Sequence, residues 1–198
     1  MRFIGITGAI GAGKTEIINY IKMNYPCRVY LADEVAHLVK AKGTKGYRRL
    51  VELLGTGILD TDGEIHKGRM AERIFADVAL LEQVNAIIHP LVQEFILEKY
   101  EEAKGDPHCD FFFVEAALLI EAGYGDLVDE MWYVYASEEV RRKRLIQSRG
   151  YSDEKIQSIF SKQLSEEEFR MNCDFVIDNS GTKEDAFLQV DKRLKSIQ

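Results

Sequence analysis

The stretch MRFIGITGAIGAGKTEIINYIK (residues 1–22) decides the fold class of this chain of 198 residues. An apolar run, a glycine-spaced turn and an amphipathic helical pattern follow one another, and residues 8–15 (GAIGAGKT) fit G-x-x-x-x-G-K-[ST] at every fixed position. In such a phosphate-binding loop (P-loop) successive N–H groups point at one anion, and the following helix adds its positive dipole end. We therefore predict a nucleotide site in which Lys14 reaches the β- and γ-phosphates and the Thr15 hydroxyl binds Mg²⁺.

Five short apolar runs predict the sheet to which this loop belongs. They lack a clean polar–apolar alternation, which is typical of parallel strands buried on both faces. Helical patterns lie between them, so the chain is predicted to be α/β with three layers. Only the third run could instead be a buried helical segment. The runs cover residues 2–7, 28–32, 111–116, 131–136 and 175–178.

The segment between the second and third runs is longer than one crossover helix requires. We predict that it forms a helical substrate-binding insertion. Its clearest helix covers residues 78–103, with apolar residues at three- or four-residue steps. Pro90 should kink this helix, because proline removes a backbone donor and clashes with the preceding turn. For the pair His89-Pro90, a kinked core helix and a ligand contact are equally good interpretations.

Composition excludes several other classes of protein. The net charge of −7 argues against a nucleic-acid binder, which usually carries a basic patch. No apolar run approaches the ~20 residues of a membrane span, and no secretory signal is evident, so we expect a cytoplasmic protein without a membrane partner. The three cysteines and four histidines are scattered, which supports neither a disulfide framework nor a zinc site.

A phosphotransferase needs carboxylates beside the P-loop, and the sequence offers two. Asp33 follows the second strand and would project into the crevice where open α/β sheets bind ligands, positioned to accept a proton from an attacking hydroxyl. It could equally be the N-cap of a helix starting at Glu34. Glu115 follows the third strand and could orient metal-bound water, or it could simply be a partly buried, paired carboxylate.

A basic run after the fourth strand supplies candidate cations for the transferring phosphoryl group. Ser137 is predicted to cap the helix that carries this run. A solvated basic face is the usual explanation, but a glycine-containing turn and another helix follow, which favours a lid that closes over the phosphates and excludes water. The cations are Arg141, Arg142, Lys143, Arg144 and Arg149.

A GTPase switch is the main competing interpretation of the P-loop. Residues 60–63 (DTDG) match D-x-x-G, and residues 182–185 (TKED) match the guanine-reading pattern [NT]-K-x-D. The first lies in a predicted turn rather than at the end of a buried strand. The second begins four residues after a strand and leaves only 13 residues beyond it, too few for another strand and helix. Context therefore disfavours the switch.

Taken together, these positions resemble the dephospho-CoA kinase family over nearly the full length of the chain. The P-loop TGAIGAGKT (7–15) and LADEVAH (31–37) match its first two motifs, and six further motifs follow in the family's order. They are DGEIHKGRMAERIF (62–75), His89-Pro90, ALLIE (117–121), RLIQSR (144–149), QLS (163–165) and CDFVIDNSG (173–181). Leu31, His37 and Ala117 depart from the family's Asp, Arg and Pro, which leaves the detailed substrate contacts open.

The resemblance implies ATP-dependent phosphorylation of the 3′-hydroxyl of dephospho-coenzyme A, the last step of coenzyme A synthesis. It implies a nucleoside-monophosphate-kinase fold in one domain: a five-stranded parallel core (about 1–33, 106–140 and 172–198), a CoA-binding lobe (about 34–105) and a small lid (about 141–171). Without the family resemblance, a nucleoside-monophosphate-type kinase would be an equally good interpretation. We expect a monomer or a weak homo-oligomer.

The resemblance also implies roles for individual residues. Lys14 and Asp33 would act in catalysis, with Asp33 as the general base, and Arg144 or Arg149 in the lid would support the phosphates; which of the two arginines is catalytic is left open. Thr15 and Glu115 would serve Mg²⁺. The nucleotide would be held by Gly8, Gly11, Ala12, Gly13, Lys14, Thr15 and Glu16, with Asn179 and Gly181 near the adenine.

Overall fold

The computed structural model describes residues 1–75 and 77–198. The chain forms two compact units. The sheet unit contains Met1–Val29 and Glu102–Gln198, and the helical unit contains Tyr30–Glu101. The predicted insertion, residues 34–105, falls largely within the helical unit, whereas Asp33, which the prediction assigned to the core, also lies there.

Five strands form one parallel sheet, as predicted. The order across it is β2-β3-β1-β4-β5, so the P-loop strand β1 is central. Parallel registers join β1 to β3, β1 to β4, and β4 to β5. Each strand lies within one residue of its prediction, and the third run is a strand rather than a helix. The strands are β1 (Arg2–Thr7), β2 (Cys27–Leu31), β3 (Phe111–Glu115), β4 (Glu130–Tyr135) and β5 (Phe175–Asp178).

The helices of the sheet unit begin where the sequence places good caps. The side chains of Ser137, Ser152, Ser165 and Thr182 each accept the backbone N–H three residues further on, which satisfies a donor that the helix leaves unpaired. The Ser137 cap is confirmed. The helices are α1 (Lys14–Asn24), α6 (Glu138–Arg149), α7 (Asp153–Phe160), α8 (Glu166–Met171) and α9 (Lys183–Ile197).

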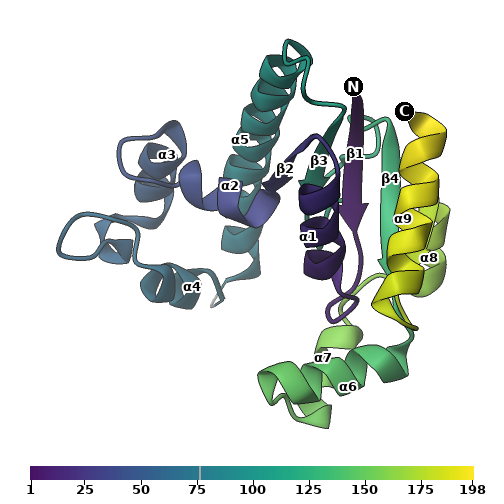
Figure 1. Cartoon of the computed structure of the whole chain (residues 1–198). Coiled ribbons are helices and arrows are strands. Elements are labelled where there is room, and N and C mark those ends of the chain that lie inside the picture. Colours follow the sequence, from purple (N-terminus) through teal and green to yellow (C-terminus); the bar gives the residue numbers. More distant parts are fainter. Residues whose placement is uncertain (76) are drawn as a thin grey trace. The chain divides into compact units, whose positions relative to one another are not determined.

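Helices cover both faces of the sheet, which confirms the three layers (Figure 1). On one face, Trp132 of β4 and Arg193 of α9 both donate to the carboxylate of Glu130. On the other, the ring of Tyr133 stacks on Phe169 of α8 with centroids 4.6 Å apart. Residues alternate between the faces along β4, so neighbouring side chains serve opposite layers.

The helical unit contains α2 (Ala32–Leu38), α3 (Lys45–Leu54), a short 3-10 helix η1 (Thr56–Ile58), α4 (Lys67–Phe75) and most of α5 (Val78–Lys104). α5 continues past Pro90 without ending, and both His89 and Pro90 are exposed. Thr44 caps α3 by accepting the N–H of Tyr47 at 3.1 Å. The insertion is helical, as predicted.

The interpretation of Asp33 as an N-cap is wrong. α2 begins at Ala32 with Leu31 as its N-cap, so Asp33 already lies in the first helical turn. Alanine is a strong helix former, and acidic side chains in a first turn interact favourably with the helix dipole. The helix therefore starts earlier than a capping aspartate would allow.

Candidate active site

The P-loop has the backbone that anion binding requires. Gly8 and Gly13 have φ of 148° and 95°, a region that L side chains rarely adopt. A Cβ on Gly8 would press against the carbonyl oxygen of Val134, and one on Gly13 against the side-chain amide of Asn179. Glycine at these two positions therefore allows both the close approach of neighbouring atoms and the curvature of the backbone.

Lys14 lies inside this loop beside a carboxylate. Its Nζ donates to the carbonyl oxygen of Gly8 at 2.7 Å and lies 3.8 Å from Oε1 of Glu115. Both side chains are largely shielded, with 13% and 18% of their surface exposed. β1 and β3 are parallel neighbours, so the topology brings these two charges to the same edge of the sheet. Sequence reasoning proposed them separately, and the structure places them together.

The guanidinium group of Arg144, on α6, contacts the backbone of the P-loop. Its Nη1 donates to the carbonyl oxygen of Ala12 at 3.2 Å and its Nη2 to that of Asn179 at 2.9 Å. Asn179 follows β5, is 97% shielded, and its Nδ2 donates to the same Ala12 oxygen at 2.8 Å. A guanidinium fork and an amide thus hold the backbone of the loop in place.

Gln163 is a contact that sequence reasoning missed. It lies between α7 and α8, and its Oε1 accepts the backbone N–H of Ile10 in the P-loop at 3.2 Å. The sequence contains it only within the QLS motif, to which no role was attached. The two residues are 153 positions apart, so no local pattern could have paired them.

The other lid arginines serve different purposes. Arg142 donates to Asp153 at 3.0 Å and to Glu138 at 2.9 Å, which links α6 to α7. Arg141 lies over the ring of Phe160 of α7, 4.3 Å from its centroid. Arg149, at the end of α6, is exposed and lies over the Tyr151 ring at 5.9 Å. Together with Lys155 it lowers the pKa of Tyr151.

Three predicted nucleotide contacts lie at or near the surface. Thr15 is exposed in the first turn of α1. Glu16 forms an ion pair with Lys183 of α9 at 2.9 Å. Gly181 is exposed just before α9. Among the described residues no group of three or more His, Cys, Asp or Glu side chains could hold a metal.

Asp33 lies in the helical unit, exposed in the first turn of α2. Its charge acts on Lys40, which follows α2. Burial and the neighbouring Lys67 lower the pKa of Lys40, and the Asp33 carboxylate opposes that shift. His37 lies one helical turn after Asp33, so both are on the same side of α2.

The GTPase motifs have ordinary structural roles. The Oδ1 of Asp60 accepts the N–H groups of Asp62 and Glu64, which forms a turn rather than the end of a parallel strand. Thr182 caps α9, and its hydroxyl donates to the carboxylate of Asp185 at 2.6 Å. Neither motif meets the context of a guanine-nucleotide switch.

Comparison with known proteins agrees with this geometry. The family profile described as dephospho-CoA kinase matches residues 2–185. The chain belongs to the dephospho-CoA kinase family. It is 35% identical over 198 residues to the dephospho-CoA kinase of Streptococcus mutans serotype c, covering 100% of this chain and 98% of that one. The Aquifex aeolicus dephospho-CoA kinase is 34% identical over 192 residues, with 97% and 95% covered.

Solved structures show the same fold. TT1252 from Thermus thermophilus has a TM-score of 0.82 at 24% identity, covering 99% of this chain and 97% of that one. The dephospho-CoA kinase from Campylobacter jejuni has a TM-score of 0.73 at 22% identity, with 98% and 96% covered. A shikimate kinase from Acinetobacter baumannii has a TM-score of 0.55 at 12% identity, with 100% and 93% covered. The fold is that of the P-loop kinases. No described helix is both long and apolar enough to cross a membrane.

Proposed function

We propose that this protein, as a member of the dephospho-CoA kinase family, transfers the γ-phosphoryl group of ATP to the 3′-hydroxyl of dephospho-coenzyme A, giving coenzyme A and ADP. One observation carries the proposal: a glycine-built phosphate cradle, with Lys14 beside Glu115, in a chain that matches this family over residues 2–185. The phosphate cradle supports binding of a nucleoside triphosphate. The family supports dephospho-coenzyme A as the acceptor.

The P-loop amides and Lys14 would bind the β- and γ-phosphates and stabilise the negative charge that spreads over the transferring group. Lys14 already lies against the carbonyl oxygen of Gly8, so a short movement within the loop would bring its ammonium group to a phosphate. The Thr15 hydroxyl and Glu115 would hold Mg²⁺, which would supply positive charge against the β- and γ-phosphates.

The two lid arginines predicted to act in catalysis have different proposed roles. The guanidinium of Arg144 contacts P-loop carbonyls, which supports a positioning role: it holds the loop that binds the phosphates. Arg149 lies exposed at the end of α6, which supports a direct contact with the phosphates when the lid closes. Asn179 holds the loop through Ala12, and the exposed Gly181 beyond it would contact the adenine.

Asp33 would act as the general base toward the acceptor hydroxyl. It is exposed at the start of α2, as a group that must meet a substrate has to be. An ionised carboxylate within hydrogen-bond reach of a hydroxyl orients it and takes its proton as the new O–P bond forms.

A coupled ADP-release assay tests this function. MgATP is offered with dephospho-CoA, UMP, CMP, AMP or no acceptor, and GTP replaces ATP in a parallel series. We expect release that depends on dephospho-CoA and ATP. Release with UMP or CMP instead would favour a nucleoside-monophosphate kinase, and acceptor-independent release with GTP would favour a switch. Size-exclusion chromatography of the same preparation tests the expected monomer or weak homo-oligomer.

A further inference from the structure

Two cations lie against one aromatic ring at the tip of the lid, in the turn between α6 and α7. The Nζ of Lys155 lies 3.7 Å from the centroid of the Tyr151 ring, and the guanidinium carbon of Arg149 lies 5.9 Å from it. The face of an aromatic ring attracts cations at distances up to about 6 Å. Tyr151 therefore holds together two like charges that would otherwise repel each other.

The backbone of this turn is fixed at both ends. Gly150 ends α6 in the left-handed conformation, with φ of 60°, and its N–H donates to the carbonyl oxygen of Ile146 at 3.0 Å. The Ser152 hydroxyl begins α7 by accepting the backbone N–H of Lys155 at 3.3 Å. Because both helix ends are capped, the cations on either side of the Tyr151 ring are held by an ordered backbone.

Carboxylates do not neutralise these two cations. In the part of the chain that the structure describes, no ion pair joins Arg149 or Lys155 to an acidic side chain. The acidic residues of the turn have other partners. Asp153 pairs with Arg142 at 3.0 Å, and a hydrogen bond from its own backbone N–H is the main cause that lowers the pKa of Glu154. The lid tip thus carries two positive charges that an anion could neutralise.

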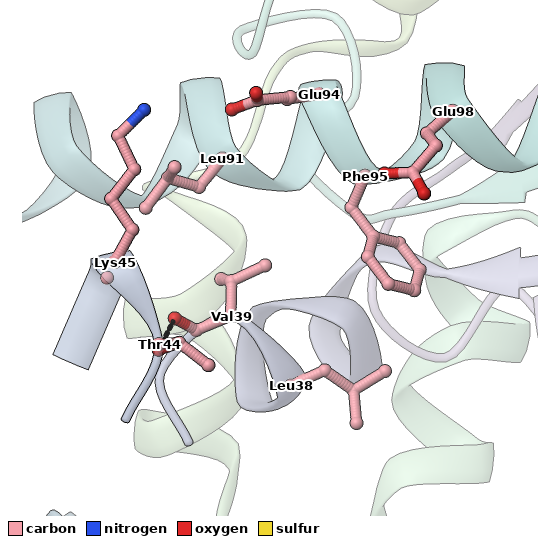
Figure 2. Close-up of a pocket in the computed structure, with 9 residues that line it drawn as sticks. Leu38, Val39, Thr44, Lys45, Leu91, Glu94, Phe95 and Glu98 are labelled. Atoms are coloured by element: carbon pink, nitrogen blue, oxygen red, sulfur yellow. Dashed lines mark hydrogen bonds between the residues drawn. The ribbon is translucent and has the colours of Figure 1, made fainter. Parts of the chain in front are cut away.

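Lys45 of the helical unit shows the contrasting case of a lysine with acidic neighbours. It lines a cavity of about 350 Å³ together with Glu94 and Glu98 of α5 (Figure 2). Two carboxylates there oppose the charge of one lysine, so the cavity repels a phosphate group. The lid tip has the opposite balance of charge, which suits a phosphate group.

The lid tip continues the side of α6 that contacts the P-loop. A Cβ on Gly11 would lie 3.1 Å from the carbonyl oxygen of Arg141 and 3.2 Å from the side chain of Leu145. Arg149 follows Leu145 by four residues, so it lies on the same side of the helix, about 6 Å further along. The paired cations therefore lie at the end of the helix face that meets the phosphate-binding loop.

Lys155 is poorly placed for the stability of its own helix. It lies in the first turn of α7, at the positive end of the helix dipole, where acidic side chains are favoured. Asp153 and Glu154 in the same turn follow that preference. A lysine that opposes the dipole is better explained by a ligand than by the helix.

We propose that Lys155 is a second phosphate-binding cation of the lid, which contacts the triphosphate of ATP beside Arg149 when the lid closes. Tyr151 is the positioning residue, because its ring holds both cations together before the nucleotide binds. The inference rests on the ATP site of the proposed function and adds two residues to it. Both lie between the RLIQSR and QLS motifs (144–149 and 163–165) and belong to neither.

Calorimetric titration with a non-hydrolysable ATP analogue and with ADP tests Lys155. In Lys155→Ala we expect about tenfold weaker binding of the analogue, as for loss of one charge-assisted hydrogen bond, and a smaller loss for ADP, which has no γ-phosphate. Lys155→Arg keeps a cation and should restore most of the affinity. The melting temperature of Lys155→Ala should stay close to that of wild type, because the first turn of α7 loses an unfavourable charge together with the ring contact.

Variants of Tyr151 test the positioning role. Tyr151→Phe keeps the ring face and should keep most of the affinity, whereas Tyr151→Leu removes the ring and should weaken binding of the analogue severalfold. In the double variant Tyr151→Leu/Lys155→Ala the loss should be smaller than the sum of the two single losses, since both act through the same cation. Additive losses, or an equal loss in Tyr151→Phe and Tyr151→Leu, would overturn the role of the ring.

Two lysine variants are the controls. Lys162→Ala removes an exposed lysine from the same lid, and Lys45→Ala removes the lysine beside the carboxylates of α5. Both should bind the analogue as wild type does. If Lys155→Ala binds it within about twofold of wild type, or if Lys162→Ala loses as much, the inference is overturned.

The titrations also separate this inference from the proposed function, because they need no acceptor. If wild type binds the analogue but does not phosphorylate dephospho-CoA, only the proposed function is overturned. If wild type does not bind the analogue, both are overturned. Lys155 is exposed, so its variants should fold, and thermal melting verifies this for each protein.

Discussion

The guanidinium of Arg144 and the side-chain amide of Asn179 donate to the same carbonyl oxygen, that of Ala12 in the P-loop, at 3.2 and 2.8 Å. Arg144 also donates to the carbonyl oxygen of Asn179 at 2.9 Å. Residues from α6 and from the end of β5 thus fix one point of the loop. The conformation of the phosphate cradle depends on this three-way contact.

Replacing Arg144 with Ala should loosen the cradle. We expect the KM for ATP to rise about tenfold or more and the free energy of unfolding to fall by about 2 kcal/mol, because several charge-assisted hydrogen bonds disappear. Arg144→Lys should recover only part of the ATP affinity and of the stability, since an ammonium group cannot reproduce the planar fork of a guanidinium group. Steady-state kinetics and thermal melting measure the effects. Lys143→Ala, the exposed neighbour on α6, is the control; an equal effect there would contradict the role of Arg144.

Gln163 should affect ATP through its bond to the N–H of Ile10. Gln163→Ala removes the acceptor, so we expect severalfold weaker ATP binding. Gln163→Glu keeps an acceptor but places a carboxylate beside the triphosphate, so its ATP binding should be weaker still while its melting temperature stays close to that of wild type. Calorimetry with ATP gives this ranking, and equal affinity in all three proteins would remove Gln163 from the site.

Local sequence patterns were sufficient to predict the sheet and the P-loop. Strands buried on both faces have continuous apolar runs, and the glycine spacing of residues 8–15 has one well-known structural use. The pairing of Lys14 with Glu115 was not predictable in the same way, because it depends on β1 and β3 being neighbours.

The partners of the lid arginines could not be predicted from the sequence. Arg141, Arg142 and Arg144 are chemically alike and lie within four consecutive residues, yet they contact Phe160, Asp153 and Ala12 respectively. Helical periodicity turns each side chain in a different direction, and its partner is set by tertiary packing. The alternative interpretation of Asp33 as an N-cap was wrong for a local reason, since a helix can start at an alanine without a capping side chain.

Two of the cysteines, Cys27 and Cys173, should react slowly in the folded protein. Burial raises the pKa of the Cys27 thiol to about 11 and that of Cys173 to about 12. Only the thiolate is nucleophilic, so at pH 8 the modification rate with a disulfide reagent should be about a hundredfold or more below that of the guanidinium-unfolded chain. The rate should keep rising through pH 9 and 10, where an ordinary thiol levels off. Cys27→Ser and Cys173→Ser assign the signals, and a plateau near pH 9 in the signal of either of these two thiols would contradict the shift.

Lys14→Ala should impair catalysis far more than folding. The lysine contributes charge at the phosphates, and we expect kcat/KM to fall about a thousandfold, as for loss of a major electrostatic contact in phosphoryl transfer. The melting temperature should change by only a few degrees, because the contacts of the side chain with the Gly8 carbonyl oxygen and Glu115 are polar rather than core packing. Lys22→Ala, an exposed lysine on the same helix, should behave as wild type does in both assays.

Asp33→Asn tests the base most directly, because it keeps the shape of the side chain and removes its charge. Loss of a general base lowers turnover by about 10²–10⁴-fold, so kcat should fall by that factor while the KM for ATP changes little. Helix α2 loses only a small dipole interaction, about 0.5 kcal/mol, so the protein should remain folded.

Glu34→Gln provides the matched control for Asp33, because it neutralises the adjacent exposed carboxylate in the same helical turn. Its turnover should stay within about twofold of wild type, since a neighbour that points elsewhere cannot take the proton of the acceptor hydroxyl. Single-turnover measurements at saturating ATP and dephospho-CoA isolate the chemical step from product release. Near-normal turnover in Asp33→Asn, or an equal loss in Glu34→Gln, would show that the proton goes to another group.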